Sequence, residues 1–226
     1  MVSNSQTTFL FSHLITDNVL VAFETLHYLK RKSQGKLGYM ALKLDMSKAY
    51  DRIKWKFLEK ILRHLGFSRK IRTTIMSCIK SVSYVVLLNG ESVGHIKSGR
   101  ALQQGEPLSP YMFLLCAMGL QSLLHKPESN GLIRVVSICR NGPRVSHLLF
   151  VNDSILFCRA KESECQIILD LLAIYEKGSG QKINGDKTNI FFQLKHSPGH
   201  ADPYTTTFKC PLPLRNIWGP YPCWKS

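Results

Sequence analysis

The chain has 226 residues, a hydrophobic fraction of 44% and a formal net charge of +15. This size and hydrophobicity allow one large domain with a sizeable core. Residues 1–80 hold fifteen Lys or Arg against five Asp or Glu, so the positive charge lies among segments expected to be ordered. That charge favours a polyanionic partner, most often nucleic acid, over a role in solubility or at a membrane surface.

The cysteines and apolar runs exclude several other classes of protein. Seven Cys without CxxC pairing, and no secretory signal, predict reduced thiols in an intracellular protein, nuclear or cytoplasmic and not secreted. The cysteines and histidines of the last 31 residues lack zinc-ligand spacing. The longest apolar run, 111–120, is too short to span a bilayer, so no membrane partner is expected.

The first eighty residues predict three helices and one strand. A helix from Thr16 to about Lys30 is expected to bury the apolar residues that recur at helical spacing, which are Val19, Leu20, Phe23, Leu26 and Leu29. Residues 39–45 predict a strand, in which Leu42 and Leu44 alternate with Lys43 and Asp45. Two helices are then expected over 51–65, with Asp51 as N-cap, and over 69–80.

The rest of the chain mixes strands and helices without strict alternation, which predicts the α+β class. Asn89-Gly90 predicts a hairpin, and Ser109-Pro110 predicts the start of a helix that runs to about His125. The other expected elements are strands over 133–138, 145–150, 155–158 and 188–192 and a helix over 161–177. Prolines recur throughout residues 194–226, so this tail is expected to be irregular or disordered, outside a domain over 1–193.

The stretch from His147 to Cys158 reads as two apolar strands folded about Asn152-Asp153. Asn and Asp tolerate the backbone angles of a tight turn, so the pair is expected at the tip of a hairpin, where an acidic residue can hold a metal ion. Asp45, at the end of the strand over 39–45, is the candidate second carboxylate. Two carboxylates on neighbouring strands can hold two Mg²⁺ ions, as in nucleotide-joining enzymes. Taken alone, a strand-end Asp is more often a turn or cap residue, so the metal-site interpretation of Asp45 depends on its neighbours.

Four motifs occur in order along the chain: LKLDMSKAYD (42–51), QGEPLSP (104–110), FVND (150–153) and SGQKIN (179–184). Together they closely resemble the polymerase motifs of reverse transcriptases from plant LINE-type (non-LTR) retrotransposons. The resemblance runs from about Leu14 to Phe192. It implies a right-hand polymerase palm, an antiparallel sheet with packed helices, together with partial fingers and a missing thumb.

The resemblance also implies roles for individual residues and for partners. Asp45 matches the first catalytic aspartate, Tyr50 an aromatic gate against a nucleotide 2′-hydroxyl, and Gln104 and Gly105 a loop that touches nucleotide and template. Lys187 lies where a later motif often supplies a phosphate-facing Lys. Tyr50 also reads as a core aromatic, and Lys187 as an ordinary exposed Lys. The implied partners are an RNA template, a DNA primer and a dNTP, with Mg²⁺ or Mn²⁺ at Asp45 and Asp153.

The sequence departs from the family pattern at the metal-binding hairpin. The family motif reads Phe-Ala-Asp-Asp, whereas here Val151 and Asn152 precede Asp153. Asn lacks the charge that a divalent ion prefers in its ligands, so weakened metal binding and impaired catalysis are expected. Gln103 likewise replaces a usual Arg beside the nucleotide loop. Alternatives are a non-catalytic domain that binds nucleic acid and a relic without function.

Overall fold

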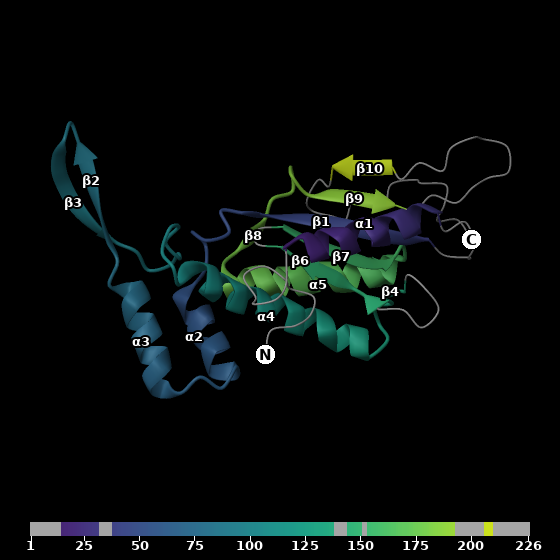
Figure 1. Cartoon of the computed structure of the whole chain (residues 1–226), viewed down its shortest axis with the longest axis horizontal. Coiled ribbons are helices and arrows are strands. Elements are labelled where there is room, and N and C mark those ends of the chain that lie inside the picture. The colour runs from purple at the N-terminus through teal and green to yellow at the C-terminus, as the bar shows by residue number, and fades with distance from the viewer. Residues whose placement is uncertain (1–14, 32–37, 138–143, 151–152, 193–205, 210–226) are drawn as a thin grey trace.

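The computed structural model describes residues 15–31, 38–137, 144–150, 153–192 and 206–209. Its centre is an antiparallel sheet in the order β10-β9-β1-β7-β6, and β8 pairs with the end of β1 (Figure 1). The strands are β1 (Tyr39–Ser47), β6 (His147–Leu149), β7 (Asp153–Arg159), β8 (Lys182–Ile183), β9 (Asn189–Phe192) and β10 (Thr206–Lys209). Helices pack on this sheet, so the expected α+β class is confirmed.

The alternating side chains of β1 contribute to two separate apolar cores. Leu42, Leu44 and Met46 are buried in a core shared with helices α4 (Ser109–Ser129) and α5 (Glu162–Ser179). Ala41, on the opposite face, is buried in a second core with residues of helix α1 (Ile15–Arg31). Successive side chains of a strand point to opposite faces, so one strand stabilises both layers. The expected buried face of α5, from Cys165 to Tyr175, is confirmed.

Helix α1 buries only part of the predicted face: Leu29 is buried and Leu26 is partly buried against the second core. Val19, Leu20 and Phe23 are 36%, 62% and 69% exposed, so their predicted burial was wrong. The buried residues of the helix include Asn18, Ala22, Thr25 and Leu29. Asn18 Nδ2 donates a hydrogen bond to the Leu149 carbonyl at 3.3 Å, which ties the start of α1 to the end of β6. The spacing of apolar residues does not predict which side of α1 faces the sheet. That orientation depends on the polar contact of Asn18 and on small buried residues such as Ala22, which allow close packing.

Two further helices and a hairpin form the other end of the molecule. Helices α2 (Trp55–His64) and α3 (Arg69–Lys80) precede the hairpin β2 (Ser83–Leu88) and β3 (Glu91–Lys97), which extends away from the sheet (Figure 1). Asn89 and Gly90 have φ values of 51° and 87°, as a two-residue hairpin turn requires, so this predicted hairpin is confirmed. Strands β4 (Val136–Ser137) and β5 (Arg144–Val145) form a separate small pair.

The boundaries of α3 agree with the prediction, whereas the start of α2 does not. Helix α3 spans Arg69–Lys80, as predicted. Helix α2 begins at Trp55 with Lys54 as N-cap, so the prediction that Asp51 caps this helix was wrong. The motif residues 48–52 instead form turns between β1 and α2. The Tyr50 carbonyl accepts a hydrogen bond from Leu102 in the loop that follows β3, and the Ala49 carbonyl accepts one from the Gln181 side chain. No helix in the described ranges is both long and apolar enough to cross a membrane.

The tail expected to be irregular contributes one short strand. Residues 206–209 form β10, which pairs with β9 from Thr206–Phe192 to Lys209–Asn189. The remaining residues of the tail lie outside the described ranges, so the boundary at residue 193 stays a prediction.

Gly180 lets the end of α5 approach the turn after β1. It has a φ of +83°, and a Cβ at this position would lie 2.6 Å from the Arg52 carbonyl oxygen. The neighbouring Ser179 carbonyl accepts a 2.8 Å hydrogen bond from the Lys54 amide. The Gly in the fourth motif therefore joins that motif to the first one.

We expect Gly180→Ala to destabilise the fold more than Gly66→Ala does. Both positions have φ near +80°, but nothing lies within 4 Å of a Cβ at Gly66. The strain of a positive φ costs each variant about 1–2 kcal/mol, and steric overlap adds about 1–3 kcal/mol for Gly180→Ala. Urea unfolding monitored by circular dichroism measures both. Equal losses in the two variants would contradict the close approach at Gly180.

Candidate active site

Asp45 and Asp153 lie directly opposite each other on neighbouring strands. They are the last register pair of β1 with β7. Side chains in this relation share one face of the sheet and have Cβ atoms about 4.5–5.5 Å apart. Both residues are partly exposed. The pairing brings together the two aspartates proposed from the sequence, which are 108 positions apart in the chain.

The hairpin that carries Asp153 is closed by one backbone hydrogen bond. The Phe150 amide donates to the Asp153 carbonyl at 2.8 Å, and Leu149 pairs with Ser154. Asp153 is therefore the first residue of β7, and the prediction that it occupies the turn was wrong. The two residues between Phe150 and Asp153 are Val151 and Asn152, which lie outside the described ranges. The ladder of β7 with β1 and β6 thus holds the backbone of the aspartate.

A buried histidine supports the same hairpin. His147 begins β6 and pairs with Leu156 of β7. Burial, and then the charge of His125, lower its pKa to about 4, so its imidazole is neutral near pH 7. The Ser146 hydroxyl donates to Glu128 at 2.9 Å and can therefore accept from Nδ1–H of His147, 2.8 Å away. The neutral ring packs under the hairpin without adding a cation near the carboxylates.

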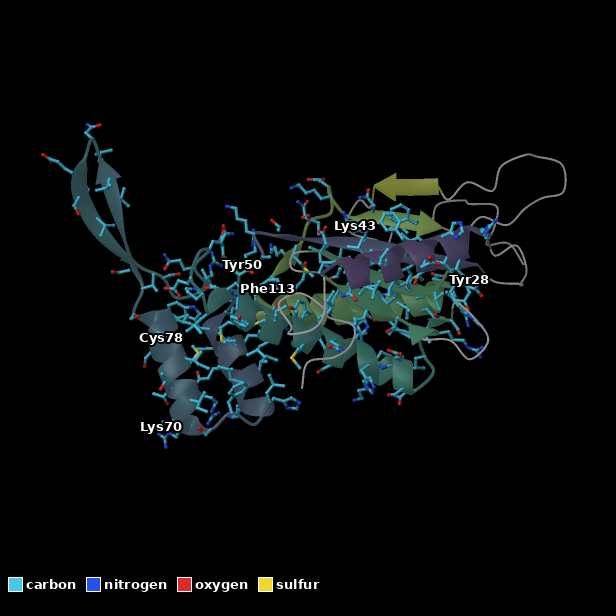
Figure 2. The ribbon with its side chains drawn as sticks, in the orientation of Figure 1. Tyr28, Lys43, Tyr50, Lys70, Cys78 and Phe113 are labelled. Carbon is cyan, nitrogen blue, oxygen red and sulfur yellow. The ribbon has the colours of Figure 1, made fainter. Side chains whose placement is uncertain are left out.

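Lys43 is the residue of this site that the sequence analysis missed. Its Nζ lies 3.4 Å from Oδ2 of Asp153, and both side chains are about two-fifths exposed, at 42% and 39%. Figure 2 shows Lys43 on the sheet, away from α2 and α3. Lys43 precedes Asp45 by two positions on β1, so it shares the face of Asp45. The two-residue spacing could have indicated from the sequence that Lys43 lies beside Asp45. The ion pair with Asp153 could not be predicted in this way, because it depends on the register between β1 and β7.

The fourth motif reaches the site through the backbone of Asp45. The Asn184 amide donates to the Asp45 carbonyl at 2.8 Å, next to the pairing of Met46 with Ile183. Lys187 is exposed in the turn that follows, where its amide donates to the Asn184 carbonyl at 3.3 Å. The structure thus places Lys187 in a segment fastened to Asp45.

Tyr50 joins the first motif to helix α4. Its ring stacks on Phe113, with centroids 4.7 Å apart and planes 20° apart (Figure 2). The Tyr50 carbonyl accepts a 3.0 Å hydrogen bond from the Leu102 amide. Burial raises the pKa of the Tyr50 phenol, so it stays protonated. The ring is only partly buried, so both the core and the gate interpretations of Tyr50 fit this position.

The loop between β3 and α4 carries the second motif. Gln104 and Gly105 are exposed in a turn, and Gly105 has a φ of +94°. The loop is held by the Leu102 bond to Tyr50 and by the Trp55 indole, whose Nε1 donates to the Ala101 carbonyl at 2.8 Å. Gln104 and Gly105 are therefore tethered to the segment that follows Asp45.

The donor set at this site suits a hard divalent cation. Asp45 and Asp153 supply carboxylate oxygens, the ligand type that Mg²⁺ and Mn²⁺ prefer. Within the described ranges, no group of three or more His, Cys, Asp or Glu residues is arranged to hold a metal ion. Mg²⁺ is commonly bound by one or two carboxylates, with water and substrate phosphates completing its shell. The pair therefore fits a metal that is bound together with a phosphate-bearing substrate.

Comparison with known proteins agrees with this geometry. A family model described as "Reverse transcriptase (RNA-dependent DNA polymerase)" matches residues 2–209. An uncharacterized mitochondrial protein of Arabidopsis thaliana is 38% identical over 68 residues, which are 30% of this chain and 56% of that protein. A 149 kDa protein of transposon TX1 from Xenopus laevis is 26% identical over 182 residues, which are 77% of this chain and 13% of that protein.

A third relative and several solved structures extend the comparison. The Pol polyprotein of the type-1 retrotransposable element R2 from Popillia japonica is 24% identical over 162 residues, which are 71% of this chain and 25% of that protein. Telomerase of Candida tropicalis, solved with a fragment of telomeric RNA, superposes with a TM-score of 0.57 at 15% identity, over 79% of this chain and 29% of that one. The apo form without its C-terminal domain gives a TM-score of 0.55 at 16% identity, over 85% of this chain and 38% of that one. The expected polymerase palm is confirmed by this likeness.

Proposed function

The chain belongs to the reverse transcriptase (RNA-dependent DNA polymerase) family, and we propose that Asp45 and Asp153 form its metal-binding centre for RNA-directed DNA synthesis. It is a reverse transcriptase domain related to those of retrotransposon proteins. The observation that carries the proposal is the direct cross-strand pairing of the two aspartates. Members of this family depend on divalent metal, and we propose Mg²⁺ or Mn²⁺ as the ion here.

The proposed reaction joins a dNTP to a DNA primer on an RNA template. When bound, divalent ions activate the primer hydroxyl and neutralise the triphosphate. The chain's own task is to hold two carboxylates at a fixed separation on a rigid sheet, with α4 and α5 packed behind them and α1 covering part of their own face. The chain spans 56%, 13% and 25% of the lengths of the three curated relatives. The template, primer and dNTP are therefore proposed for this chain, and not taken over from those relatives.

The surrounding motif residues are proposed to contact the nucleotide. The partly buried Tyr50 ring, held flat on Phe113, suits a fixed wall against a ribose 2′-hydroxyl. Gln104 and Gly105 are exposed in a loop anchored to Tyr50, as contact with nucleotide and template requires. Lys187 follows Asn184, which is bonded to Asp45, so a phosphate-facing role suits its position.

We further propose that Asn152 lowers the activity of this centre. Asn152 directly precedes Asp153 and stands where the family motif has a carboxylate. An amide oxygen lacks the negative charge that offsets the cost of dehydrating a divalent ion. Each tenfold loss of rate corresponds to about 1.4 kcal/mol of barrier, so weakening the binding of one ion by about 3 kcal/mol would lower the rate about a hundredfold.

We expect Asn152→Asp to raise primer extension on an RNA template by at least about a hundredfold, because it restores a charged ligand beside Asp153. The assay compares the parent chain and the variant with Mg²⁺ and with Mn²⁺. The same variant carrying Asp45→Asn is the matched control, and it should lose the gain. If extension is unchanged by Asn152→Asp, the proposal that this position limits the parent chain is wrong.

In the Asn152→Asp protein, we expect Tyr50→Val to increase ribonucleotide incorporation relative to deoxynucleotide incorporation by about tenfold or more. Removing the ring opens the space that a 2′-hydroxyl would occupy, and a steric clash of this kind is worth roughly 1–3 kcal/mol. Tyr50→Phe keeps the stack on Phe113 and should leave the ratio unchanged. A constant ratio in a folded Tyr50→Val protein would assign Tyr50 to the core alone.

A second candidate function is nucleic-acid binding without catalysis. Along α2 and α3 the exposed side chains include Lys56, Lys60, Arg63, Arg69, Lys70 and Lys80, against one acidic residue, Glu59. None of these cations has an ion-pair partner among the residues that the structure describes. Lys70 lies in the first turn of α3, at the end of that helix that is far from Tyr50 and Lys43 (Figure 2). Such a surface suits phosphate contacts whether or not the metal centre works.

We expect the affinity for an RNA–DNA hybrid to fall steeply with salt, and Arg69→Glu with Lys70→Glu to weaken binding and flatten the salt slope by about 1–2. Fluorescence anisotropy over a range of KCl concentrations measures both quantities. Arg134→Glu, a charge reversal at an exposed position between α4 and β4, is the control and should change the slope less. Binding that does not depend on salt would exclude this surface as a phosphate contact.

A further inference from the structure

Lys43 is placed where it can act on the metal centre without being a ligand of it. Its ammonium is 3.4 Å from the Asp153 carboxylate, the one ion pair within 4.0 Å among the residues that the structure describes. Its cross-strand neighbours are Ile155 on β7 and Asn189 on β9, neither of which is charged. Lys43 thus supplies positive charge on the sheet face that holds Asp45 and Asp153.

The cross-strand pairing of the aspartates creates a repulsion that Lys43 offsets. Like charges directly opposite each other on antiparallel strands destabilise the pairing. Without a metal ion, Asp45 and Asp153 form such a pair, and an ammonium on the same face lowers the local charge from −2 to −1. An exposed ion pair alone contributes little to stability, so its position beside a second carboxylate is what gives Lys43 a role.

We propose that Lys43 holds Asp153 in the metal-free protein and is displaced when a divalent cation binds the aspartate pair, so that Lys43 sets the metal affinity. This inference rests on the proposed metal centre. A cation and an ammonium compete for the same Asp153 oxygen, and they repel each other when both are near. Lys43 is therefore a positioning residue that keeps the site folded at the cost of weaker metal binding.

The test measures Mn²⁺ binding to the full chain by isothermal titration calorimetry, with melting temperatures taken with and without Mn²⁺. Lys43→Met removes the charge and keeps most of the chain length, whereas Lys43→Arg keeps the charge. We expect Lys43→Met to bind Mn²⁺ about tenfold more tightly, because a divalent ion no longer faces an ammonium a few ångströms away. Its metal-free melting temperature should fall, and Mn²⁺ should raise it more than in the parent chain.

Lys126→Met on α4 is the matched control, because Lys126 is exposed and has no ion-pair partner within the described ranges. It should leave Mn²⁺ affinity unchanged, as should Lys43→Arg. Lys43→Gln removes the same charge with a polar side chain and serves if the Met variant does not fold. Equal Mn²⁺ affinity in the parent and the charge-removed variant would overturn this inference and leave the proposed metal centre standing.

A different result would bear on the metal centre itself. If the parent, Lys43→Met and Lys43→Met with Asn152→Asp all fail to bind Mn²⁺, the proposed metal centre is overturned and the role of Lys43 with it. Failure of the Lys43 inference and failure of the metal centre are thus distinguishable. Only failure of the metal centre removes Mn²⁺ binding from every protein tested.

Discussion

The antiparallel pairing of β1 with β7 sets the geometry on which the site depends. Register in such a pair is a choice between discrete states, because a slip of one residue moves every side chain to the other face. Here Leu42 and Leu44 must enter the core beneath α4 and α5, and this requirement fixes the register. The same register puts Asp45 opposite Asp153 on the other face. Burial on one face of the strand thereby positions charge on its other face.

Packing on the second face supports the end of the sheet that carries the charges. Residues of α1 share a core with Ala41 and Phe157, and Asn18 bonds the end of β6 beside the hairpin. Asp45 and Asp153 themselves stay partly exposed. A helix that covered the whole face would have buried two carboxylates, at an effective cost of several kcal/mol for each charge. The incomplete cover leaves both carboxylates accessible from solvent.

Lys43 and Asn152 change the charge at this site in the same direction. Two aspartates remain where the family motifs have three, and one of them pairs with an ammonium. The chain thus keeps the polymerase palm, and the proposed metal centre carries less negative charge than the family pattern does. The cations along α2 and α3 do not depend on this centre. A loss of catalysis and a retained affinity for nucleic acid are therefore compatible in one fold.

Much of the local structure followed from the sequence. Helix α3, the Asn89-Gly90 turn, the Ser109 helix start and the buried face of α5 were all predictable, because local spacing and turn chemistry determine them. The position of the α2 N-cap, expected at Asp51, was not predictable, because the turn after β1 bonds to a distant loop. The buried face of α1 was not predictable either, because it depends on the contact between Asn18 and Leu149.

The sequence by itself determined the four motifs, the two aspartates and the replacement of a carboxylate by Asn152. Only the tertiary structure decided that Asp45 faces Asp153, that Asp153 begins a strand instead of forming a turn, and that Lys43 pairs with it. These facts depend on contacts between residues more than a hundred positions apart, which spacing along one chain does not encode. Core packing on the opposite face of the sheet fixes the strand register from which these contacts follow.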